Sequence, residues 1–121
     1  MTEQPIYHMA HAADWARAQA GETYLGSADD LRDGFIHFST AAQVAESAAK
    51  HRAGQADLVL IAVDPAALGD ALKWEPGRHD EAFPHLYGPL PAAAVVGADP
   101  LPLGPDGMHQ FPPHIPPAPA A

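Results

Sequence analysis

Two short apolar runs in this chain each carry one histidine. The first is Ile6-Tyr7-His8, and the second, about a third of the way along, is Gly34-Phe35-Ile36-His37-Phe38-Ser39. An imidazole among apolar neighbours in a strand needs a hydrogen-bond partner, and two such strands can bring His8 and His37 to one cleft. The pattern therefore predicts a polar site in an apolar setting, where an imidazole can hold a ligand or move a proton.

The residues after His37 indicate what such a site would bind. Ser39 and Thr40 come directly before an expected helix, whose first backbone N–H groups have no partner within the helix. Together with the imidazole, those N–H groups favour an anionic or sugar-phosphate ligand. The alternative is that Ser39 and Thr40 only cap the helix, which they can do in either case.

More polar candidates follow in the second half of the chain. Residues 83–90 read Phe-Pro-His-Leu-Tyr-Gly-Pro-Leu, a loop and strand start that carry His85 and Tyr87. His85 is an acid or base candidate, and Tyr87 can stack on a flat ring or donate a hydrogen bond, unless it is a core residue. Glu75 next to Trp74 is interpreted as a solvated carboxylate, with a carboxylate of raised pKa as the alternative.

A metal site is a different hypothesis for the same residues. Its ligands would be nitrogen and oxygen atoms suited to zinc or a related ion, from His8, His37 and His85 with Glu75 or Asp80. The chain contains no cysteine, and it has no short-range ligand pair of the His-x-His or HExxH kind. No metal is therefore expected, and the metal site stays an alternative.

The elements that position these side chains follow from the apolar pattern and the turn residues. Residues 58–63, Leu-Val-Leu-Ile-Ala-Val, form a continuous apolar run that is typical of a central strand buried on both faces. Residues 41–52 have the pattern of an amphipathic helix, and Thr40 is its expected cap. Shorter strands are expected at 6–9, 35–38, 72–75, 85–87 and 93–96, and further helical segments at 10–20 and after Ser27.

Strands outnumber helices in this pattern, and the helices fall in the first half of the chain. The fold class is therefore predicted as α+β, a compact single domain with a mixed, mostly antiparallel sheet and two or three helices. At 121 residues the chain is long enough for one core. The domain is expected over residues 5–98, and residues 99–121, which hold eight of the 14 prolines, are expected to form an extended or loosely attached tail.

Charge and composition exclude several classes of function. Six Lys and Arg against 15 Asp and Glu give a net charge of -9, which disfavours the wrapping of nucleic acid and binding to anionic membranes. A basic spot at Lys50, His51 and Arg52 is interpreted as solvated surface, although it could hold one small anion. The absence of cysteine excludes disulfides and thiolate catalysis, and without a targeting or membrane-spanning segment the expected location is cytoplasmic.

Taken together, these motifs resemble the family numbered 952 among the domains of unknown function. The resemblance covers about residues 5–98, and the motifs that carry it are Ile6-Tyr7-His8, Trp15, Gly34-Phe35-Ile36-His37-Phe38-Ser39, Gln43-Val44, Asp57-Leu58-Val59-Leu60, Trp74-Glu75 and Phe83-Pro84-His85-Leu86-Tyr87-Gly88-Pro89-Leu90. The family is thought to be a distant, compact relative of the ADP-ribosyltransferase fold. The resemblance therefore implies an ADP-ribosyltransferase-like fold and, if the protein is an enzyme, a transferase that uses NAD.

The same resemblance implies roles for individual residues. His8 resembles the first-strand histidine that holds a ribose hydroxyl of NAD, and His37 falls where a tyrosine usually stacks beside nicotinamide. His85 and Tyr87 lie where the transferases carry a glutamate, so the carboxylate that would stabilise an oxocarbenium-like centre is missing there. The residues expected to contact a nucleotide are Ser39, Thr40, Tyr24 and Tyr87.

Three functions stay open from the sequence. The first is an enzyme that transfers or cleaves ADP-ribose or a ribose phosphate, which requires His8, His37 and His85 to meet at one cleft. The second is a non-catalytic module that binds a nucleotide or a small anion, which suits the missing glutamate. The third is a histidine-based metal protein. The expected partner is a small nucleotide-like molecule, and the sequence does not indicate the oligomeric state.

Overall fold

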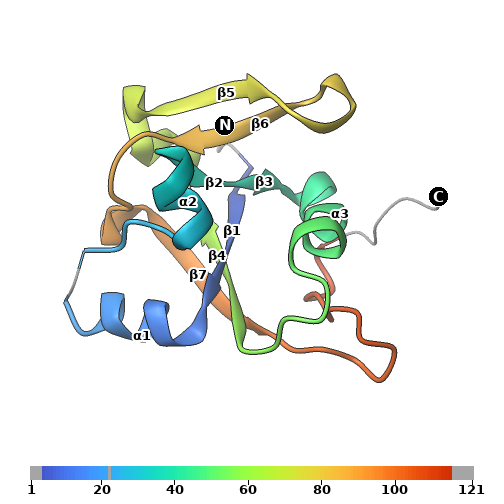
Figure 1. Ribbon diagram of the computed structural model, residues 1–121. Coiled ribbons are helices and arrows are strands. Elements are labelled where there is room, and N and C mark those ends of the chain that lie inside the picture. The colour runs from blue at the N-terminus through green and yellow to red at the C-terminus, as the bar shows by residue number, and fades with distance from the viewer. Residues whose placement is uncertain (1–3, 22, 116–121) are drawn as a thin grey trace.

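The computed structural model describes residues 4–21 and 23–115, which form two antiparallel sheets and three α-helices (Figure 1). The part of the expected tail from residue 116 onward lies outside the described residues. The α-helices are α1 (Ala12–Gln19), α2 (Ala28–Asp33) and α3 (Ala41–His51), all in the first half of the chain as predicted. No helix in these described ranges is long and apolar enough to cross a membrane.

The larger sheet has four strands in the order β3-β1-β4-β7, and every neighbouring pair is antiparallel. Its strands are β3 (Ser39–Thr40), β1 (Ile6–His11), β4 (Leu58–Val63) and β7 (Val95–Leu101). The prediction of a central strand over 58–63 is confirmed, because β4 pairs on both sides and Ile61 and Val63 are fully buried.

The smaller sheet has three strands in the order β2-β6-β5, again antiparallel. Its strands are β2 (Ile36–His37), β6 (Ala82–Leu86) and β5 (Leu72–Pro76). The register places His37 directly opposite His85, although the two residues are far apart in the sequence. This sheet is the element that brings two of the candidate histidines together.

The prediction of one mixed sheet is therefore wrong in its details. The expected strand over 35–38 is instead a chain segment that leaves one sheet and enters the other, with Phe38 between β2 and β3. Phe38 N–H donates to the Pro84 carbonyl of the smaller sheet at 3.0 Å. An extended segment has the same apolar pattern whichever sheet it pairs with, so the change of sheet is not visible in the sequence.

Local signals account for the helix ends. Ser27 and Asp30 form a capping box at the start of α2, and the Thr40 N–H donates to Gln43 Oε1 at 3.0 Å at the start of α3. The cap at Thr40 was predicted from its residue type, and Ser27 is where the expected second helical segment begins. The remaining helical turns are short 3₁₀ segments at Pro65–Ala71, Arg78–Asp80 and Ala92–Ala94.

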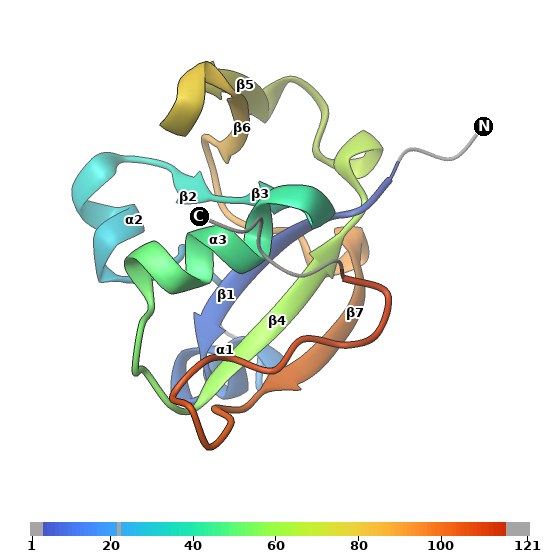
Figure 2. The same ribbon diagram turned by 90° about the vertical axis from the view of Figure 1, so that its right-hand side faces the viewer.

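Each face of the larger sheet carries its own apolar cluster. Ile6 and Ala10 of β1 face one cluster with Phe38 and Leu86, whereas Tyr7 faces the other. Figure 2 shows α3 across the second face in front of β1, with the segment that follows β7 along the same side. The alternation of β1 thus turns His8 toward the first face and Tyr7 toward the second.

The segment after residue 98 is packed on the domain as far as the structure describes it. β7 continues across the expected boundary to Leu101, which pairs with Leu58 and is fully buried. Ile115 is 6% exposed, and His109 Nε2 lies 2.8 Å from the Gln55 carbonyl oxygen. Of the two expectations for the tail, extended or loosely attached, loose attachment does not hold for residues 99–115, because the apolar residues between the prolines have a sheet face to cover.

Candidate functional site

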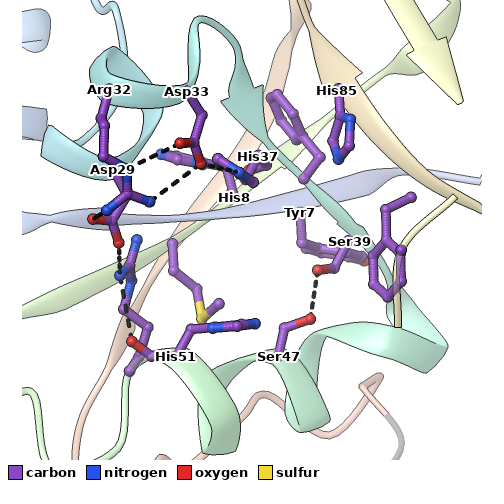
Figure 3. Close-up of a pocket in the computed structure, with 15 residues that line it drawn as sticks. Tyr7, His8, Asp29, Arg32, Asp33, His37, Ser39, Ser47, His51 and His85 are labelled. Atoms are coloured by element: carbon purple, nitrogen blue, oxygen red, sulfur yellow. Dashed lines mark hydrogen bonds and ion pairs between the residues drawn. The ribbon is translucent and has the colours of Figure 1, made fainter. Parts of the chain in front are cut away.

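One cavity gathers most of the candidate residues. Its volume is about 410 Å³, and it lies between α2, α3, β1 and the smaller sheet (Figure 3). His8, His37, Ser39 and His85 all line it. The convergence that the enzyme hypothesis requires of the three histidines is therefore present.

Three other candidates are not among the residues that line the cavity. Tyr24 is buried behind His8, Tyr87 lies beside the strand that carries His85, and Thr40 is at the start of α3. These positions do not support the direct nucleotide contacts expected of them. Tyr24 instead contacts His8, which lines the cavity, and Tyr87 donates to Glu75, the partner of cavity-lining His85.

His8 is held rigidly by hydrogen bonds at both ring nitrogens. Nδ1 lies 2.7 Å from the His37 carbonyl oxygen, which only accepts, so Nδ1 carries the proton. Nε2 of the neutral ring then accepts from the Tyr24 hydroxyl at 2.6 Å. Burial lowers the pKa of His8, although nearby Asp30 opposes this, so the ring is a neutral imidazole that fixes the strand of His37.

Asp30 is a central residue of the site that the sequence did not identify. Its side chain is 1% exposed, and Oδ1 accepts from the His37 backbone N–H at 3.0 Å and lies 2.5 Å from His37 Nδ1. Oδ2 accepts from the Ser27 N–H at 2.7 Å. Burial by itself raises the pKa of Asp30, but the hydrogen bonds donated by the His37 side chain and by the backbone of Ser27 and His37 outweigh it and lower the pKa to about 2. Asp30 is therefore an ionised carboxylate inside the protein.

Only part of this arrangement is visible in the sequence. Acids after Ser27 are residue types that stabilise the first turn of a helix, which requires no buried partner. The spacing Ser27-x-x-Asp30 is also that of a capping box, which turns the carboxylate back toward the chain. The contact with His37 depends on Gly34, whose left-handed backbone (φ 87°) ends α2 and directs the chain back past Asp30.

His37 lies between two carboxylates. Nδ1 faces Asp30, and Nε2 lies 3.2 Å from Asp33 Oδ2, while the side chain remains 41% exposed. Only the Nδ1 contact with Asp30 is a hydrogen bond, and the contact with Asp33 is an ion-pair distance. His37 thus lies between two carboxylates and is accessible from the cavity.

His85 has its own carboxylate on the neighbouring strand. Its Nδ1 lies 2.7 Å from Glu75 Oε1, which also accepts from the Tyr87 hydroxyl at 2.6 Å. These hydrogen bonds, that of Tyr87 first, lower the pKa of Glu75, so the alternative of a carboxylate with a raised pKa is wrong. The ring of His85 also stacks on Phe35, with centroids 4.1 Å apart. Donation from Nδ1 to Glu75 leaves Nε2 as the nitrogen that can accept a proton.

The two histidine–carboxylate pairs meet on one wall of the cavity. The ring centroids of His37 and His85 are 5.6 Å apart, with an interplanar angle of 67°. Each ring lines the cavity and is oriented by a carboxylate. This is the arrangement that general acid–base catalysis needs.

The opposite wall comes from α3 and α2. Ser47 and His51 face the cavity from α3, and the Ser47 and Ser39 hydroxyls are 2.9 Å apart (Figure 3). Arg52 is only 12% exposed and contacts Asp29 of α2 at 3.3 Å. The interpretation of the basic spot as solvated surface is therefore wrong for Arg52, because the end of α3 lies against α2.

The structure offers little to a metal ion. Among the described residues, no group of three or more His, Asp or Glu side chains is arranged to hold one. His8 is unsuitable for a further reason, since both of its nitrogens are engaged with Tyr24 and the His37 carbonyl. The metal hypothesis loses one of its three imidazole ligands.

Comparisons with known proteins place this site in context. A family profile described as "Protein of unknown function (DUF952)" matches residues 9–98. The crystal structure of protein CC0527 from Caulobacter crescentus is similar to this chain at 47% identity, with a TM-score of 0.84 over 88% of this chain and 94% of that one. The solution NMR structure of CC0527 is similar at 47% identity, with a TM-score of 0.77 over 88% of this chain and 91% of that one. No curated protein matches the chain.

Proposed function

The chain belongs to the DUF952 family of proteins of unknown function, and we propose that its cavity is the acid–base site of an enzyme for small ribose-phosphate ligands. The observation that carries this proposal is the meeting of two histidine–carboxylate pairs on one cavity wall. The ligands proposed are NAD, ADP-ribose or a related nucleotide, which the enzyme would cleave or transfer. The protein would act in the cytoplasm, and no metal is needed for this chemistry.

The proposed roles of the three histidines follow from which of their ring nitrogens can donate or accept a proton. His85, with Nδ1 donating to Glu75, accepts a proton from water or a ribose hydroxyl at Nε2. His37, between Asp30 and Asp33, donates a proton to the leaving group. His8 takes no part in proton transfer. It fixes the position of His37, because its ring hydrogen-bonds to the His37 carbonyl oxygen.

The volume of the cavity limits the size of the ligand that it can enclose. A volume of about 410 Å³ lies toward the lower end of small-molecule sites, which span about 300–1,000 Å³. We infer that one nucleotide unit is enclosed, and that a dinucleotide such as NAD would enter with one half. The ribose phosphate is the part shared by all of the proposed ligands.

A non-catalytic binding module is the second candidate, and one observation favours it. Among the described residues that line the cavity there is no glutamate, and Glu75 reaches it only through His85. An ADP-ribosyltransferase of the usual kind places a glutamate at the reacting centre. Our proposal instead assigns the acid and base roles to imidazoles. A cavity that binds without turnover would keep the histidines as ligand contacts only.

The test measures binding and turnover separately. Calorimetry with NAD, ADP-ribose and AMP gives the affinities, and chromatography of the same mixtures after incubation detects nicotinamide, ribose or phosphate release. The variants are His37→Asn and His85→Asn. We expect turnover to fall by about 10²–10⁴-fold in each, with affinity changed far less, because each removes one proton-transfer group.

His79→Asn is the matched control. His79 is 60% exposed, pairs with Glu46 and is not among the cavity-lining residues, and Asn tolerates its left-handed backbone (φ 59°). Turnover equal to that of the wild type is expected for this variant. Binding by the wild-type protein without any product would contradict the enzyme and support the binding module, and the absence of binding would remove both.

A further inference from the structure

The cavity has a second polar wall at the end of α3, opposite the strands that carry His37 and His85 (Figure 3). We propose that Arg52 and His51 form an anion subsite that binds the phosphate of the ligand, so that its sugar lies toward the two histidines. This inference rests on the proposed function, and it names the chemical group by which the cavity selects its ligand.

Arg52 is a partly buried cation whose N–H donors make only long hydrogen bonds or none. Its side chain is 12% exposed, and Nη1 contacts Asp29 Oδ2 at 3.3 Å and the His51 carbonyl oxygen at 3.4 Å. Nη2 reaches Ser27 Oγ only at 3.5 Å, and Nε is buried with no partner in the described part of the chain. Charge-assisted hydrogen bonds of arginine are about 2.7–2.9 Å long, so an anionic acceptor at this guanidinium would add interactions that the protein does not supply.

The carboxylate that Arg52 contacts is shared with another cation. Asp29 is 49% exposed, and its Oδ1 lies 3.3 Å from Nη1 of Arg32. An exposed carboxylate of this kind is stabilised by water and by Arg32, and its long contact with Arg52 contributes little. A phosphate can therefore replace Asp29 at Arg52 with a bidentate pair of hydrogen bonds.

The arginines and aspartates that line the cavity carry no net charge together. Arg32, Arg52, Asp29 and Asp33 line it, so arginine and aspartate charges balance. Asp33 accepts from Arg32 at 2.9 Å and faces His37, which compensates its charge. The net charge of the chain is -9, so a phosphate is not attracted from a distance and must be selected by local contacts with Arg52 and His51.

The subsite predicts a preference that can be measured directly. Calorimetry of the full chain with AMP and with adenosine compares ligands that differ only in the phosphate. We expect the wild type to bind AMP at least about tenfold more tightly than adenosine, as a charge-assisted arginine–phosphate pair provides. Arg52→Gln should reduce this ratio to near one and leave the affinity for adenosine unchanged.

Arg17→Gln provides the matched control. Arg17 pairs with Asp14 on α1 and is not among the residues that line the cavity. The AMP-to-adenosine ratio should stay at its wild-type value in this variant. A wild-type ratio near one would overturn the subsite, and so would an equal loss of both affinities in folded Arg52→Gln protein, or no binding of AMP at all.

A second measurement covers the case in which Arg52→Gln does not fold. Inorganic phosphate is titrated into isotope-labelled wild-type protein and into Arg52→Lys, which keeps the charge but not the fork of donors. Shifts of the His51 and Arg52 signals, with weaker affinity in Arg52→Lys, support the subsite, and shifts confined to other residues overturn it. Failure of the proposed catalysis can be distinguished from failure of the subsite. In that case AMP still binds through Arg52, but no ligand is converted.

Discussion

The two histidine–carboxylate pairs of the cavity have the same chemistry but differ in where the carboxylate lies. Asp30 is 1% exposed and accepts hydrogen bonds with both of its oxygens, whereas Glu75 is 37% exposed and receives both of its donors on Oε1. A buried carboxylate without its partners is costly, and an exposed one is stabilised by water. The pair of Asp30 and His37 is therefore needed for the stability of the fold, whereas the pair of Glu75 and His85 can be altered without unfolding the protein.

The largest effect is expected from Asp30→Asn. The amide keeps the shape of the side chain but presents a donor to some of the Ser27 and His37 groups that now donate to the carboxylate. We expect a loss of about 3–5 kcal/mol in the free energy of unfolding, because a buried charged partner is removed. Urea unfolding measures it, and a loss below about 1 kcal/mol would contradict the structural role of Asp30.

Acid titration is expected to have the next largest effect. The pKa of Asp30 is lowered from 3.8 to about 2, so the folded protein binds its proton less readily than the unfolded chain. Its stabilisation, on the order of 2 kcal/mol, is present above about pH 4 and is lost as pH falls toward 2. The pKa of His8 is lowered from 6.5, so stability also decreases as pH falls below 6.5, while the unfolded chain takes up the proton.

Urea unfolding at a series of pH values between about 7 and 3 tests both statements. The Asp30→Asn variant should lack the decrease near pH 4 and keep the one that begins near 6.5. A stability that rises when the pH is lowered from 7 would contradict the neutral state assigned to His8.

Tyr24→Phe should have a moderate effect. The substitution keeps the ring packed against Trp15 and His8 but removes the hydroxyl that donates to His8 Nε2. A buried acceptor left without a donor costs about 1–2 kcal/mol. Tyr87→Phe is the matched control, because it removes a hydroxyl that is bound to exposed Glu75, and its thermal unfolding should match that of the wild type. Equal losses in the two variants would contradict the distinction between the pairs.

Glu75→Gln is expected to have the smallest effect on stability. Glu75 is partly exposed, so the melting temperature should stay at its wild-type value. The proton on His85 Nδ1 loses its charged acceptor, and we expect nitrogen NMR of the imidazole to show a changed balance of the two tautomers. An unchanged imidazole spectrum would mean that Glu75 does not orient His85.

The sequence predicted the local features of the fold well. Strand β4, the cap of α2 at Ser27 and the cap of α3 at Thr40 all depend on residues within a few positions of one another. Apolar periodicity and capping are local, so they can be recognised without knowledge of the partner elements. The candidate histidines were found for the same reason, since a histidine inside an apolar strand stands out from its neighbours.

The missed features all depend on contacts between distant segments. Arg52 was interpreted as solvated surface and Asp30 was not identified, whereas the structure partly buries Arg52 and fully buries Asp30, each against another element. Glu75 was known as a residue next to Trp74, but its contact with His85 exists only because β5 and β6 pair. Charged residues have the same local pattern on a solvated face as in a cavity wall, and only packing distinguishes the two.

By itself, the sequence determined that this protein is an α+β domain with apolar strands, two or three helices in its first half and histidines at strand positions. Tertiary structure alone decided that the strands form two sheets, that His37 lies opposite His85, and that each imidazole has a carboxylate. The reason is physical. Strand and helix patterns arise from the periodicity of the chain itself. The ionisation states of the His, Asp and Glu side chains instead depend on burial and on neighbouring groups, and only the pairing of distant strands brings those neighbours close.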